Sequence, residues 1–242
     1  MKTLFSICSI LFVLSFSSCN ELNNIVNQLP EVENTTLIPS KSEMAQGLKA
    51  ALEKGTLEGV SDLAKTGGYL NNALYKIYFP PSAEKVENTL RGIGLDNEID
   101  RLVSSLNKAA ENAVVEAKPL FVNAIKQMTI TDAKEILFGT DTAATSYLKA
   151  KTSSQLKAKF EPHIQQSLNQ VNATKYWTEL TTRYNQIPLV EKVETNLSRY
   201  VTERAVRGLF LKIAAEEKAI RTNPKERTTA LLEKVFNYAD SN

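Results

Sequence analysis

Apolar residues recur at helical spacing along most of the chain from Ser40 onward. In the clearest case, apolar positions at i, i+3 and i+4 spacing form one stripe between Asp96 and Ala113. The same phase continues beyond Pro119 as far as Met128. This continuity predicts two helices that meet at a kink, because proline bends a helix without changing which face is apolar.

Capping signals predict further helices on both sides of this kinked pair. Ser40-Lys41-Ser42-Glu43 has the capping-box pattern. Asp141 is expected to cap a short helix, Thr152 or Ser153 to begin the next, and Ser198 to open a long one. We therefore expect an all-α fold, with a single multi-helix domain of about eight to ten helices, a kinked central helix and no disulfides.

Residues 1–18 have the layout of a secretory signal peptide. Lys2 gives a short positive start, an apolar run of thirteen residues follows from Leu4 to Phe16, and two serines come next. This run is too short to span a bilayer, which needs about 20 apolar residues.

Cys19 follows the two serines, and Phe16-Ser17-Ser18-Cys19 resembles the lipobox of bacterial lipoproteins. In such proteins the cysteine thiol carries a diacylglyceryl group and the chain is cleaved just before it. Phe16 stands where the usual pattern has Leu, and plain secretion with cleavage near Ser18 is the alternative. We expect Cys19 to anchor the protein in the bacterial cell envelope, at the outer membrane facing the periplasm.

Cleavage before Cys19 would leave 224 of the 242 residues. The only other cysteine, Cys8, would be lost with the signal, so no internal disulfide can form. Residues 19–39 are mostly polar and contain two prolines, and we interpret them as the lipidated N-terminus and a flexible tether. Residues 40–242 then form the single helical domain, which is large enough to fold around its core without disulfides.

Composition and charge exclude several classes of function. The formal charge is only +2, so nothing favours a nucleic-acid partner. His163 is the only histidine, and with no free cysteine in the mature chain we expect no metal site. No motif for a P-loop, a zinc protease or a nucleophilic serine occurs, so we expect no cofactor and favour a non-enzymatic protein.

Carboxylates leave one enzymatic alternative, a carboxylate-dependent hydrolase of envelope polymers. The candidate residues lie on or beside helical stripes: Glu111, Glu116, Glu216 and Glu217. Glu216 and Glu217 point about 100° apart on one helix. A solvated face of ion pairs with Lys212 and Arg221 is the better interpretation of these two.

Four aromatic side chains are the candidates for binding. They cluster in sequence on either side of residues 187–196: Tyr176, Trp177, Tyr184 and Tyr200. Aromatic residues with polar tips are favoured in binding surfaces, although they also fill helical cores. The prediction is a helical domain that binds an envelope protein or an apolar ligand, with these residues as the candidate groove.

Asp141-Thr142-Ala143 resembles a short O-glycosylation acceptor of envelope proteins, although a helix N-cap explains it more simply.

Several stretches together resemble the bacterial domain-of-unknown-function 4197 family. They occur in order: Gly67–Asn72, Glu116–Leu137, Asp141–Lys149, Thr174–Tyr176 and Tyr200–Thr229. The similarity covers about Ser42 to Phe236. It implies an exported, mainly helical envelope protein, and it implies no activity and no catalytic residues.

Overall fold

The computed structural model describes residues 38–92, 94–186, 188–189, 192–193 and 196–242. The side chains of residues 82, 89, 90, 180, 183 and 184 are also outside this description. Residues 38–242 form one compact unit. The predicted signal peptide, Cys19 and nearly all of the tether therefore lie outside the described residues.

Every regular element in the described residues is helical, which confirms the all-α prediction. The helices are α2 (Lys41–Ala64), α3 (Glu84–Gly92), α4 (Asp96–Ala113), α5 (Ala117–Gln127), α6 (Ile130–Leu137), α7 (Ala143–Gln170), α8 (Ala173–Tyr184), α9 (Leu197–Thr222) and α10 (Ala230–Asp240). None of them is long and apolar enough to cross a membrane.

The central helix is divided into two helices with one apolar phase, as predicted, although the division comes before Pro119. A 3₁₀ turn, Val114–Glu116, separates α4 from α5. Pro119 lies in the first turn of α5, where its missing N–H costs no helical hydrogen bond. The apolar face continues across the turn, since Ala113, Val114 and Ala117 are all fully buried.

The predicted helix start at Thr152 or Ser153 is wrong, because α7 is one helix of 28 residues. Each hydroxyl donates to the carbonyl four residues earlier, at 2.7 and 2.6 Å, instead of capping a new helix. Phe160 and Ile164 are fully buried on its apolar face. This burial compensates for the backbone hydrogen bond that Pro162 removes within the helix.

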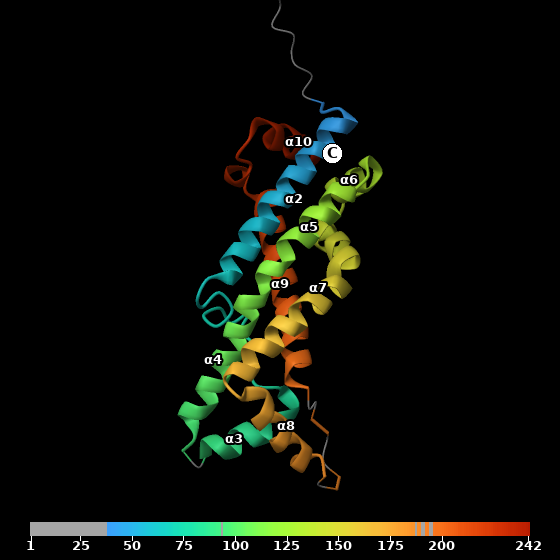
Figure 1. The fold of residues 1–242 in the computed structure, drawn as a ribbon. Helices are drawn as coiled ribbons and strands as arrows, with labels where there is room; N and C mark the ends of the chain where they lie inside the picture. The colour runs from blue at the N-terminus through green and yellow to red at the C-terminus, as the bar shows by residue number, and fades with distance from the viewer. Residues whose placement is uncertain (1–37, 93, 187, 190–191, 194–195) are drawn as a thin grey trace, which may run out of the picture. The chain divides into compact units, whose positions relative to one another are not determined.

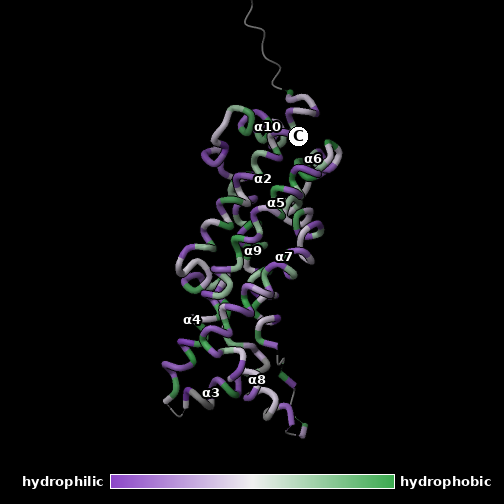
Figure 2. Tube along the Cα trace, viewed as in Figure 1, coloured by the Kyte–Doolittle hydropathy of each residue, from purple (hydrophilic) through white to green (hydrophobic). Residues whose placement is uncertain are grey.

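The helices of residues 38–242 run mostly side by side (Figure 1). α9 packs against α7 and α2, and α7 packs against α4 and α5. The start of α2 lies at the end that holds α6 and α10, while α3 and α8 lie at the opposite end. Apolar and polar segments alternate along each helix (Figure 2), as amphipathic helices around a shared core require.

Candidate functional site

An apolar groove of about 730 Å³ lies between α4 and α8. Its floor contains Phe79, Ile99 and Trp177, which are at most 5% exposed. Val171 and Tyr176 stand at its side and are 52% and 63% exposed. Large apolar side chains that remain this exposed beside a buried aromatic floor are typical of a binding surface.

Two predicted site residues, Tyr176 and Trp177, line the groove. The turn between α7 and α8 places them there. Asn172 forms this turn with a φ of +55°, a left-handed conformation that asparagine tolerates better than most residues. Ala173 then begins α8. The two neighbouring aromatic residues therefore lie on different faces of α8. Trp177 points inward and packs edge-to-face against Phe79, with 5.3 Å between the ring centroids, while Tyr176 points outward.

Phe79 reaches the groove because the segment before it is fastened to α4. The side chain of Asn107 is fully buried and pairs with the backbone of Ile77 in both directions. Its Oδ1 accepts from the Ile77 N–H at 2.8 Å, and its Nδ2 donates to the Ile77 carbonyl at 2.8 Å. An irregular segment needs such partners for its buried backbone groups.

Glu111, one turn beyond Asn107 on α4, fastens the start of the same segment. Its carboxylate accepts from the Gly67 N–H at 3.0 Å. Tyr69 then enters the core, where it is fully buried and donates its hydroxyl proton to the Ala205 carbonyl at 2.9 Å. Burial, together with the nearby Glu111 charge, raises the pKa of Tyr69 well above its usual value. These contacts hold the segment that leads to Phe79 against α4 and α9.

Of the other two predicted aromatics, Tyr200 is not among the described residues that line the groove. Tyr200 is partly buried, and its hydroxyl donates to the Tyr78 carbonyl at 3.1 Å. Burial raises its pKa, and the neighbouring Arg204 opposes that rise. The side chain of Tyr184 lies outside the description. Among the described residues, the groove is lined by the candidates Tyr176 and Trp177 and by residues of α4 that we did not predict.

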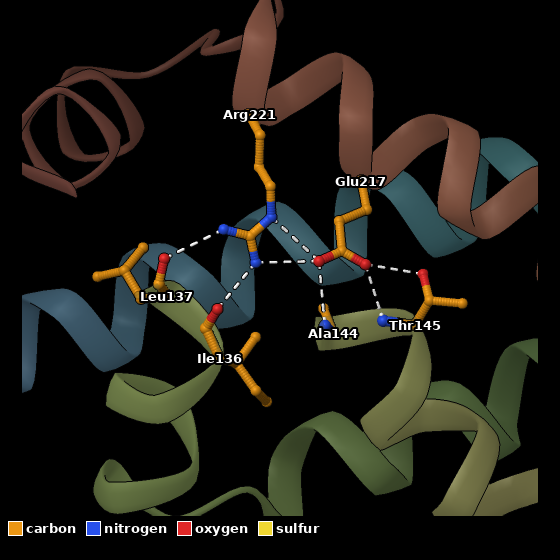
Figure 3. A network of polar contacts seen from close by, with 6 residues as sticks. All are labelled: Ile136, Leu137, Ala144, Thr145, Glu217 and Arg221. Atoms are coloured by element: carbon orange, nitrogen blue, oxygen red, sulfur yellow. Dashed lines mark hydrogen bonds and ion pairs between the residues drawn. The ribbon is translucent and has the colours of Figure 1, made fainter. Parts of the chain in front are cut away.

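A second polar arrangement, the buried pair of Glu217 and Arg221, lies on α9 (Figure 3). The Glu217 carboxylate accepts from the N–H groups of Ala144 and Thr145 at 3.0 and 2.8 Å, and from the Thr145 hydroxyl at 2.7 Å. It therefore caps the N-terminus of α7, where a negative charge is stabilised by the helix dipole.

Arg221 completes the arrangement on the other side (Figure 3). It pairs with Glu217 at 2.9 Å and donates to the carbonyls of Ile136 and Leu137 at 2.8 and 3.1 Å. Those carbonyls end α6, so one ion pair on α9 holds the end of one helix and the start of the next. Every group of the pair is satisfied by backbone or side chain, which indicates a structural role.

Two sequence predictions about this region need correction. Glu217 and Arg221 do pair, but their side chains are only 5% and 11% exposed, so this is no solvated face. Glu216 does pair with Lys212, at 2.6 Å. The cap of α7 was assigned to Asp141, whereas the N-cap position is Thr142 and the cap comes from α9.

The predicted carboxylate alternative finds no pair in the apolar groove, where Glu98 is the one carboxylate among the described lining residues. Glu116 faces His163 at 3.6 Å on the surface. Glu161 and Glu203 share a polar hollow of about 320 Å³ between α7 and α9. Glu203 is about half exposed and lies beside two cations, unlike the shielded carboxylic acid that hydrolysis requires. In the described part of the chain, no cluster of three metal-ligating side chains occurs.

The family comparison matches residues 38–237 to DUF4197, described as "Protein of unknown function (DUF4197)". The chain belongs to the DUF4197 family. The resemblance that the sequence motifs indicated is therefore confirmed. No curated protein and no solved structure matches the chain. The function of this DUF4197 protein is therefore inferred from its own residues.

Proposed function

We propose that this DUF4197 protein is a non-enzymatic lipoprotein of the bacterial cell envelope that binds an apolar ligand or an apolar segment of a partner protein. The observation that carries the binding proposal is the groove between α4 and α8, with Trp177 buried in its floor and Tyr176 exposed at its side. Apolar contact supplies affinity there, while Glu98, Arg101 and two serines at the rim supply polar contacts.

The anchor proposal rests on the sequence around Cys19. An acyl anchor contributes about 0.8 kcal/mol per buried CH₂, so two or three chains hold a protein stably at a bilayer. The start of α2, which follows the proposed tether, lies at the opposite end of the helical unit from α8. The groove therefore lies far along the helical unit from the point at which the proposed tether joins it.

The anchor is tested by fractionation of the Cys19→Ala variant. We expect the variant to leave the membrane fraction, with Ser18→Ala as a matched control that stays there. If Cys19→Ala stays in the membrane fraction, the proposal of a lipid anchor is contradicted, and the proposal of binding in the groove is unaffected.

The groove is tested with the protein's own fluorescence, because Trp177 is the only tryptophan. Titration with palmitate or anilinonaphthalene sulfonate is expected to change its emission. Tyr176→Ser should weaken this binding about tenfold, because it removes an aromatic ring from the groove wall at little cost to the fold. Leu211→Ser, at a similarly exposed apolar position on α9, should not. Equal binding by both variants contradicts a site in this groove.

A further inference from the structure

The turn between α6 and α7 presents a threonine whose side chain the fold does not use. Residues 138–142 are all exposed. Thr142 occupies the N-cap position of α7, yet its hydroxyl makes no capping hydrogen bond. Asp141, just before it, makes no hydrogen bond or ion pair with the described residues.

Thr142 differs in this from the other Ser, Thr and Asn N-caps of the described α-helices. Four of them accept a hydrogen bond from a backbone N–H of their own first turn: Ser40, Thr129, Asn196 and Thr229. At α7 the Glu217 carboxylate already holds the N–H groups of Ala144 and Thr145. The simpler explanation of Asp141-Thr142-Ala143, that it caps a helix, therefore does not account for these side chains.

We propose that Thr142 is an O-glycosylation acceptor, recognised through Asp141 and the small residue Ala143. The proposal rests on the proposed function, because export brings the chain to an envelope transferase. Thr142 Oγ attacks C1 of a sugar carried on a polyprenyl diphosphate. The bond between C1 and the phosphate oxygen breaks, the diphosphate leaves with the electron pair, and a base of the transferase takes the hydroxyl proton.

The position suits a bulky hydrophilic modification. The exposed Thr142 hydroxyl makes no capping hydrogen bond that a glycan would break, and an exposed turn is where glycosylation is tolerated. The turn follows α6, at the opposite end of the helical unit from α8 (Figure 1). A glycan here would therefore leave the groove open.

The test is the mass of the full-length mature protein purified from the membrane of its native host. We expect a population heavier by an oligosaccharide, with the added mass on the peptide that contains Thr142. Thr142→Ala and Asp141→Asn should abolish the added mass, and Thr142→Ser should retain it. Thr140→Ala is the matched control, since Thr140 is exposed in the same turn but follows a glycine.

Each outcome separates the glycan from the anchor. A membrane-bound chain that begins at an acylated Cys19 and carries no added mass on Thr142 overturns the acceptor and leaves the anchor standing. A phosphate-sized increment, or a glycan that survives Thr142→Ala, also overturns it. Thr142→Ala should melt at the temperature of the unglycosylated wild type, which shows that loss of the glycan is not loss of the fold.

Discussion

Replacing Glu217 by alanine should be among the most destabilising single changes in this protein. The change removes the acceptor of two α7 amides at 3.0 and 2.8 Å. It also leaves the Arg221 guanidinium, only 11% exposed, without its counter-charge. Removing one partner of a buried, hydrogen-bonded ion pair costs about 3–5 kcal/mol. Glu217→Gln keeps an acceptor oxygen and should lose less, about 1–3 kcal/mol.

Urea unfolding at 25 °C and pH 7 measures this loss. With a slope of about 2 kcal/mol per molar, the midpoint for Glu217→Ala should fall by about 1.5–2.5 M. Glu203→Ala is the matched control on the same helix, because its two ion pairs, at 3.7 and 3.9 Å, are about half-exposed and contribute about 0–1 kcal/mol. Similar midpoints for the two variants would refute the assignment of Glu217 as the joint between α6, α7 and α9.

Three further predictions concern packing and pH. Gly208→Ala should cost about 1–3 kcal/mol in urea unfolding, because its Cβ would lie 2.9 Å from the ring of the fully buried Tyr69. Gly55→Ala should instead stabilise by up to about 1 kcal/mol, since its Cβ meets only ordinary contacts from 3.4 Å and alanine favours the helix. Glu43, held by Lys234 and the Ser40 cap, has its pKa lowered from 4.5 to about 2. Its contribution is complete above pH 4.5 and lost as the pH falls through 2, so the drop in Tm from pH 5 to 2 should be smaller in Glu43→Gln.

The parts of the fold that the sequence predicts are those governed by local pattern. The stripe through α4 and α5 predicts two helices that share one apolar face, and the 3₁₀ turn between them keeps that face continuous. The capping box at Ser40 is likewise a local signal, and it forms. The predicted helix start at Thr152 is wrong because a threonine hydroxyl inside a helix can also donate a hydrogen bond to the carbonyl four residues earlier.

The long-range contacts are the parts that local pattern could not predict. The spacing of Glu217 and Arg221 shows that they can pair, but their burial depends on α6 and α7, more than 70 positions earlier in the chain. The hydrogen bond between the Ile77 N–H and Asn107 could not be predicted either, because in the sequence a buried asparagine looks like any other polar residue of a helix. For the groove, the adjacent aromatic residues Tyr176 and Trp177 indicated a binding surface in the sequence. Ile99 and Phe79 also line it, but nothing in the local sequence distinguishes them from other core residues.

The native mass of the protein gently extracted from its own membrane tests the central proposal most directly. Binding in the groove predicts a species heavier than the acylated chain by a defined ligand or partner. Tyr176→Ser should lose that species, and Leu211→Ser should keep it. Repeated recovery of the acylated chain alone, or the same complex from Tyr176→Ser in undiminished amount, would contradict a binding function for this groove.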